Sequence, residues 1–207
     1  MPDCETLAAA AGREAGIPDG ILPAIARVES GRNGRAWAWT LNQGGKGSYH
    51  ASKEAALARL TDILATGDRN VDLGCMQINW RWHSTEFPDA ASMLDPVANT
   101  RYAARFLSAL HDRHGSWEGA IAAYHSTQPT RAAAYEHKVA VVRDKLLASQ
   151  SPDMRADETA MPLATVGLTR GLLALSGQAV VGQSSRHDMR QRRPAGLLLP
   201  SSGAALY

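Results

Sequence analysis

The sequence contains few cysteines, few aromatic residues and almost no excess of either charge. Two cysteines among 207 residues are too few for a disulfide-dense miniprotein, and they lie too far apart in the sequence for a zinc knuckle. The net charge of +2 is too small to indicate nucleic acid as a partner. No apolar run reaches the ~18 to 20 residues that a membrane-spanning helix needs. The hydrophobic content of 44% is nevertheless enough for the core of an ordinary globular protein.

The two ends of the sequence differ from its middle. Residues 1–11 lack both a basic segment and a sustained apolar segment, so we expect either a cytosolic chain or an export signal that is absent from this sequence. Residues 149–207 contain no tryptophan and are rich in scattered Ser, Gly, Gln and Pro. We therefore predict one domain over residues 1–148 and a largely disordered C-terminal tail over residues 149–207. The apolar segment 163–181 of this tail is a candidate for docking on a partner.

The first 148 residues have the pattern of a mainly α fold. Capping residues and glycines mark the ends of successive amphipathic segments. They predict helices over residues 3–15, 19–31, 52–67, 95–115, 116–124 and from 129 onward. The expected apolar stripes consist of Leu57, Leu60 and Leu64 in the third helix, Asn99, Ala103, Phe106 and Leu110 on one side of the fourth, and Tyr135, Val139, Val142 and Leu146 in the sixth.

One stretch breaks the helical pattern. Residues 37–41 alternate between apolar and other side chains, residues 42–47 offer turn chemistry, and residues 48–50 can return as a partner strand. The stretch predicts a small β-ribbon inserted between helices.

Four tryptophans form two pairs with a spacing of two residues: Trp37 with Trp39, and Trp80 with Trp82. On an extended strand this spacing places both rings of a pair on one face. Sugar rings stack on such faces, so the pairs are candidate glycan platforms. Packing explains them equally well, because indoles are also common core and surface fillers.

Glu29 falls inside the apolar stripe of its predicted helix, between Ile25 and Leu22 on the helical wheel. A carboxyl group among aliphatic side chains loses hydration, which raises its pKa and keeps a proton available for general acid catalysis. Periodicity alone favours a simpler interpretation, in which Glu29 ends the helix at the edge of the stripe and reaches solvent.

Three segments along the chain combine polar and small side chains: Glu29-Ser30, Gly74-Cys75-Met76-Gln77-Ile78-Asn79 and Ala122-Ala123-Tyr124-His125. In order and spacing they resemble the three motifs of the soluble lytic transglycosylases, over residues 3–147. The family versions contain Gly-Leu-Met-Gln-Ile and Ala-Tyr-Asn, so this chain departs at Cys75 and His125. The tryptophan-rich ribbon and the Gly-Cys-Met-Gln variant look most like a proteobacterial branch that includes flagellum-associated members.

The resemblance implies a goose-type-lysozyme-like helical domain that acts on peptidoglycan glycan strands. Glu29 would be the single catalytic acid and base that cleaves the bond between N-acetylmuramic acid and N-acetylglucosamine. The C6 hydroxyl of muramic acid would attack C1 and leave a 1,6-anhydro end, so no water, metal or other cofactor is needed. The expected setting is local cell-wall remodelling in the periplasm, with a flagellar rod or secretion-system protein as a candidate partner of the tail.

The other motif residues take supporting roles through the same resemblance. Ser30 would lie close to the acid, Met76 and Gln77 along the groove floor, and Tyr124 where its hydroxyl reaches Glu29 or the sugar. Met76 and Tyr124 could also simply be packed in the core. His125 replaces an amide, retains hydrogen-bonding capacity and titrates near neutral pH.

The cysteines acquire an expected role from the substrate that the resemblance implies. A bridge between Cys4 and Cys75 would persist in an oxidising periplasm and tie the first helix to the second motif. The alternative is two buried, inert thiols.

Other functions compete with the transglycosylase interpretation. A peptidoglycan-binding scaffold with weak or lost catalysis is disfavoured by the intact Glu29. A hydrolytic muramidase stays open, because Asp72 could approach as a second carboxylate. A thiol hydrolase built on Cys75 with His83 or His125 is disfavoured, since no base or cation stands beside Cys75 in the sequence. A metal site at His111 and His114 lacks a third ligand.

Overall fold

A computed structural model describes residues 2–150 of the chain, and the predictions for the tail at residues 151–207 lie outside the described residues. The described part is mainly α, as the sequence predicts. Its α-helices are α1 (Cys4–Glu14), α2 (Ile21–Ser30), α3 (Lys53–Ala65), α4 (Trp80–His83), α5 (Ala90–Met93), α6 (Pro96–His114), α7 (Trp117–His125) and α8 (Pro129–Gln150), with a short 3-10 helix η1 (Ser84–Glu86). Within residues 2–150, no helix is long and apolar enough to cross a membrane.

Local capping sets the ends of the long helices. The side chains of Asp3, Ser52, Asp95 and Ser116 accept hydrogen bonds from backbone amides in the first turns of α1, α3, α6 and α7. The C-cap Gly115 adopts a φ of 74°, which ends α6. All six predicted helices are therefore confirmed. The four-residue helices α4 and α5 are missed because one turn carries no detectable period.

Two small antiparallel sheets accompany the helices. One pairs β1 (Gly31–Arg32) with β2 (Arg35–Ala36), and the other has the strand order β4-β3-β5-β6. The larger sheet contains β3 (Thr40–Gln43), β4 (Lys46–Tyr49), β5 (Val71–Leu73) and β6 (Ile78–Asn79). The predicted ribbon exists as the β3-β4 hairpin, although β3 begins at residue 40 instead of 37. Strands of two or three residues are too short to be recognised from alternation.

The expected placement of the tryptophan pairs on strand faces is wrong. Trp37 and Trp39 precede β3, and Trp80 and Trp82 belong to α4. Residues two apart on a helix point in different directions, so the second pair does not share a face. Sugar stacking by any one of these rings stays a prediction.

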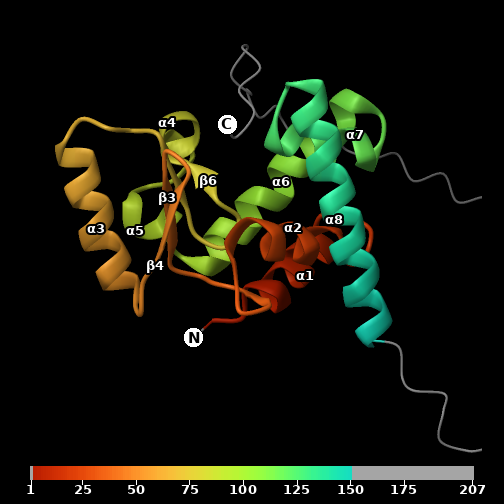
Figure 1. Cartoon of the computed structure of the whole chain (residues 1–207), viewed down its shortest axis with the longest axis horizontal. Coiled ribbons are helices and arrows are strands. Elements are labelled where there is room, and N and C mark those ends of the chain that lie inside the picture. Colours follow the sequence, from red (N-terminus) through yellow and green to blue (C-terminus); the bar gives the residue numbers. More distant parts are fainter. Residues whose placement is uncertain (1, 151–207) are drawn as a thin grey trace, which may run out of the picture. The chain divides into compact units, whose positions relative to one another are not determined.

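Helix α6 connects the two sides of the described domain. It packs against α1 and α7 on one side and against α5 on the other, while α3 and the larger sheet lie away from α8 (Figure 1). Its predicted inward face is confirmed, since all four residues are buried. In α3 the core face consists of Ala56, Leu60 and Ile63, so the stripe is rotated by one residue and Leu57 and Leu64 are only half-buried. In α8, Val142 is also half-buried.

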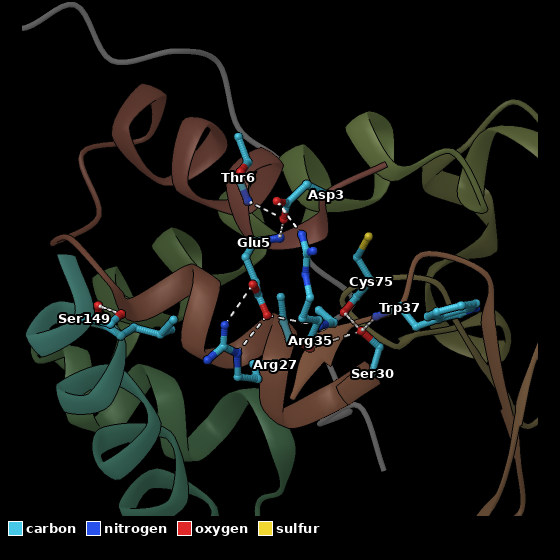
Figure 2. A network of polar contacts seen from close by, with 12 residues as sticks. Asp3, Glu5, Thr6, Arg27, Ser30, Arg35, Trp37, Cys75 and Ser149 are labelled. Carbon is cyan, nitrogen blue, oxygen red and sulfur yellow. Dashed lines mark hydrogen bonds and ion pairs between the residues drawn. The ribbon is translucent and has the colours of Figure 1, made fainter. Parts of the chain in front are cut away.

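A network of ionic contacts joins α1 to α2 and β2 (Figure 2). The Glu5 carboxylate accepts two hydrogen bonds from the Arg27 guanidinium, at 2.8 and 2.9 Å, and one from the Ala36 amide at 3.0 Å. Arg35 contacts Asp3 at 3.0 Å nearby. These contacts align α1 with the end of α2.

A disulfide joins Cys4 to Cys75 across 71 positions of sequence. Both residues are fully buried. The bond therefore attaches the start of α1 covalently to the loop between β5 and β6, which carries the second motif.

A buried carboxyl group lies in the middle of the larger sheet. The register places Asp72 of β5 opposite Asn42 of β3 and Asn79 of β6. The Asn79 amide donates to Asp72 Oδ1 at 2.7 Å. Burial raises the pKa of Asp72 to about 7, an effect that the Asn79 hydrogen bond only partly offsets.

Replacing Cys4 by Ala should lower the free energy of unfolding by roughly 3 kcal/mol, because the disulfide limits the freedom of the unfolded chain. Denaturant titration measures the loss. Reductant should bring the wild-type protein to the same level and leave the variant unchanged. Two titratable thiols in denatured, unreduced protein made in an oxidising compartment would contradict the bond.

The stability of the domain should fall as the pH rises from about 4 to 7. Because the pKa of Asp72 is raised from 3.8 to about 7 on folding, the native state binds more protons than the unfolded state in this window. The stability that protonated Asp72 contributes is fully present below the lower pKa and is lost as the pH passes the upper one. Asp72→Asn should remove this pH dependence of the free energy of unfolding, which amounts to a change on the order of a few kcal/mol. The exposed Asp62→Asn is the control, and parallel curves for wild type and Asp72→Asn would contradict the assignment.

Candidate active site

Glu29 lies half-buried in the last turn of α2 and is bonded to a tyrosine of α8. The Tyr135 hydroxyl donates to Glu29 Oε1 at 2.5 Å. A hydrogen bond this short holds the carboxyl group in one orientation. The sequence places Tyr135 in the apolar stripe of its helix but does not reveal this role. The available signal was a polar hydroxyl in an otherwise aliphatic stripe.

His125 lies against the tyrosine that binds Glu29. Its ring stacks on Tyr135 with the centroids 4.4 Å apart and the planes 3° from parallel. Burial lowers the pKa of His125, and the charges of Lys138 and Arg131 lower it further. These effects favour the neutral imidazole, and one face of its ring covers the phenol that donates to Glu29.

Ser30 connects the end of α2 to the second motif. Its side chain is fully buried, and its hydroxyl lies 2.8 Å from the carbonyl oxygen of Cys75 and 3.1 Å from that of Ala26 (Figure 2). Ser30 directly follows Glu29 in the chain, and its closeness to the acid in the active site stays a prediction. Its hydroxyl donates a hydrogen bond to the backbone of the loop 74–77.

The Tyr124 hydroxyl does not donate to Glu29, contrary to one of the two expected roles. It donates its only proton to the carbonyl oxygen of Met76 at 2.9 Å, and the residue is fully buried. Burial raises the pKa of Tyr124 well above its usual value, and the negative charges of Glu29 and Asp72 add to this effect. Tyr124 therefore supports the loop, and Tyr135 supplies the phenol at the acid.

Met76 and Gln77 are buried in the same loop rather than exposed along its surface. Their exposed fractions are 0% and 1%. The Gln77 amide donates to the carbonyl oxygens of Gly74 at 2.9 Å and Thr40 at 3.3 Å. Both side chains hold the loop from inside, which differs from the expected position on a groove floor.

Asn99 of α6 is a second residue, after Tyr135, whose place in this region the sequence analysis missed. Its Oδ1 accepts from the Met76 amide at 2.9 Å, and its Nδ2 donates to the carbonyl oxygens of Leu73 and Met93, both at 3.0 Å. Gly74 has a φ of 80°, and a Cβ there would lie 2.9 Å from Asn99 Nδ2. The signal was a polar residue within an apolar stripe, which indicates a specific buried partner.

The structure bears on three alternatives: the thiol hydrolase, the metal site and the hydrolytic muramidase. Cys75 is oxidised, so it provides no thiolate, and His83 is buried with its Nδ1 2.7 Å from the Tyr102 hydroxyl. Among residues 2–150, no three His, Cys, Asp or Glu side chains lie where they could hold a metal ion. Asp72 of β5 lies two residues before the loop 74–77, and Glu29 directly precedes Ser30, whose hydroxyl is bonded to that loop.

Comparison with known protein families gives a match. The family model for the transglycosylase SLT domain matches residues 6–139. No curated protein and no solved structure gives a match. The match spans well over half of the chain and includes Glu29, the loop 74–77, Tyr124 and Tyr135. The chain therefore belongs to the transglycosylase SLT domain family.

Proposed function

We propose that this domain is a peptidoglycan lytic transglycosylase in which Glu29 is the catalytic acid and base. Membership of the family makes peptidoglycan the substrate. The observation that carries the finer assignment is the 2.5 Å hydrogen bond from Tyr135 to the Glu29 carboxyl group at the end of α2. A carboxyl group that is half-buried and oriented by a buried phenol is suited to proton transfer.

The proposed reaction exchanges one C–O bond for another. Protonated Glu29 gives its proton to the glycosidic oxygen as the bond from that oxygen to C1 of muramic acid breaks. The resulting carboxylate then takes the proton of the C6 hydroxyl, whose oxygen forms the new bond to C1. The phenol of Tyr135 stabilises the ionised carboxylate between these steps. The products are an anhydromuramoyl end and a free N-acetylglucosamine 4-hydroxyl, with no water consumed.

The location that we propose is the periplasm, where this substrate is found. The disulfide between Cys4 and Cys75 supports an oxidising compartment, since such bonds rarely persist in the cytosol. Membership of a flagellum-associated branch, with a rod or secretion-system partner, stays a prediction. The tail that would bind such a partner lies outside the described residues.

Hydrolytic cleavage is the second candidate function. Asp72 lies near the loop that Tyr124 and Ser30 support, and its pKa of about 7 leaves part of it ionised at neutral pH. A second carboxylate would allow water to be the acceptor. Asp72 is only 4% exposed and is bonded to Asn79, which favours the single-carboxylate mechanism.

The nature of the released ends tests the proposal. Purified peptidoglycan is incubated with the wild-type protein and with Glu29→Gln, and the muropeptides are identified by mass spectrometry. We expect anhydro ends, one water lighter than hydrolysis products, from the wild type alone. Reducing ends would establish hydrolysis, and binding without products from the wild type would favour a scaffold.

The two tyrosines should differ in what their loss changes. Tyr135→Phe should lower kcat roughly 10- to 100-fold with little change in the free energy of unfolding, because it removes a charge-assisted hydrogen bond from the acid. Tyr124→Phe should mainly lower the free energy of unfolding, by about 1 to 3 kcal/mol, because the buried Met76 carbonyl loses its partner. Kinetics and denaturant titration separate the two effects. Full turnover by Tyr135→Phe would remove this phenol from the mechanism.

A further inference from the structure

An arginine lies between two aromatic rings a short distance along the chain from the acid. Arg32 of β1 follows Glu29 by three residues. Its guanidinium carbon lies 4.8 Å from the ring centroid of Trp37 and 5.2 Å from that of Tyr49. Both distances fall within the range of cation–π attraction. The three side chains come from β1, the segment before β3, and β4.

Both rings are fixed to the backbone. The Trp37 indole nitrogen donates to the carbonyl oxygen of His50 at 2.8 Å, and the Trp37 amide donates to that of Ser30 at 3.0 Å. The Tyr49 hydroxyl donates to the carbonyl oxygen of Gly31 at 3.1 Å. The two rings therefore present fixed faces to the guanidinium beside the end of α2, and these contacts reduce the side-chain freedom that Arg32 loses when it binds a ligand.

The charge of Arg32 is not neutralised within the described part of the protein. Its side chain is exposed and makes no ion pair or hydrogen bond with residues 2–150. Its neighbours differ, since Arg27 is paired with Glu5 and Arg35 with Asp3. A guanidinium offers five N–H donors in a planar fork, and the ligand that matches this fork is a carboxylate or phosphate.

The position of Arg32 limits which part of the substrate it can reach. Three residues of chain separate two Cα atoms by at most about 11 Å. A ligand group bound at Arg32 therefore belongs to the sugar on which Glu29 acts or to one of the few sugars on either side of it. In a glycan strand the acidic groups belong to muramic acid: the carboxylates of its peptide stem or, where the stem has been removed, the carboxylate of its lactyl group.

We propose that Arg32, which lies against the rings of Trp37 and Tyr49, binds a carboxylate of the peptide stem on a muramic acid at or close to the cleaved bond. The site thereby prefers glycan that carries stems. This inference rests on the proposed function, because it takes peptidoglycan to be bound with its cleaved bond at Glu29. It also gives Trp37 a role, since the ring face that Arg32 covers holds a cation and is closed to a sugar.

Paired substrates test the inference. The wild type, Arg32→Gln and the control Arg105→Gln are each given glycan strands with intact stems and the same strands after an amidase has removed the stems. Arg105 is also exposed and lies 5.5 Å from one aromatic ring, that of Tyr102, but on α6. We expect Arg32→Gln to raise KM about 10-fold on stem-bearing strands and to leave the stripped strands unaffected, as for loss of one exposed charge-assisted contact. Arg105→Gln should match the wild type on both.

Several results would overturn the inference. Equal losses on the two substrates would show a general structural role, and a loss confined to stripped strands would identify the lactyl carboxylate as the ligand. Unchanged kinetics on both would show that Arg32 binds no substrate group. Tyr49→Leu keeps the charge but removes one ring, and it should raise KM on stem-bearing strands by a smaller factor than Arg32→Gln does.

A binding measurement separates this inference from the catalytic proposal. In a Glu29→Gln background, soluble stem-bearing strands should bind about 10-fold more weakly after Arg32→Gln, while stripped strands should bind equally well. This readout does not depend on turnover. If the wild type releases no products but the binding difference is seen, the carboxylate site is supported and the transglycosylase assignment is contradicted. If the wild type releases anhydro ends but the binding difference is absent, only the carboxylate site is contradicted.

Discussion

Hydrogen bonds from several separate elements meet on the backbone of the loop 74–77. Ser30 of α2 binds the carbonyl of residue 75, Tyr124 of α7 binds that of residue 76, and Asn99 of α6 accepts from the amide of residue 76. The amide of residue 74 donates to Thr40 of β3, and the disulfide from Cys4 adds α1. Because an unpaired polar group in a buried position costs free energy, these elements must adopt one relative arrangement for all of the bonds to form.

This arrangement separates two kinds of residue within the motifs. One kind is buried and stabilises the shape of the loop, which is a structural role; it comprises Met76, Gln77 and Tyr124. Glu29 precedes Ser30, the last residue of α2, whose hydroxyl is bonded to that loop. The phenol that donates to Glu29 comes from a different helix, α8. The loop therefore fixes where the Glu29 carboxyl group lies, and the proposed mechanism gives the loop no step of its own.

The sequence was informative wherever an interaction is local. Asp3 and Ser52 cap helices by bonding amides two or three residues away, so their pattern identifies helix starts directly. The phenol that binds Glu29 could not be chosen in this way. Tyr124 and Tyr135 both lie on helices that the sequence predicts correctly, and only the packing of α7 and α8 decides which hydroxyl reaches the acid. Strands of two or three residues likewise depend on their pairing and have no period of their own.

The bond between Glu29 and Tyr135 spans 106 positions of sequence. Contacts between distant parts of a chain close large loops, whose entropy opposes them until other structure has formed. During synthesis the acid leaves the ribosome long before the helix that orients it. A chain that has formed only its first helices thus contains the carboxyl group but not its phenol, and an oriented acid is a property of the completed fold alone.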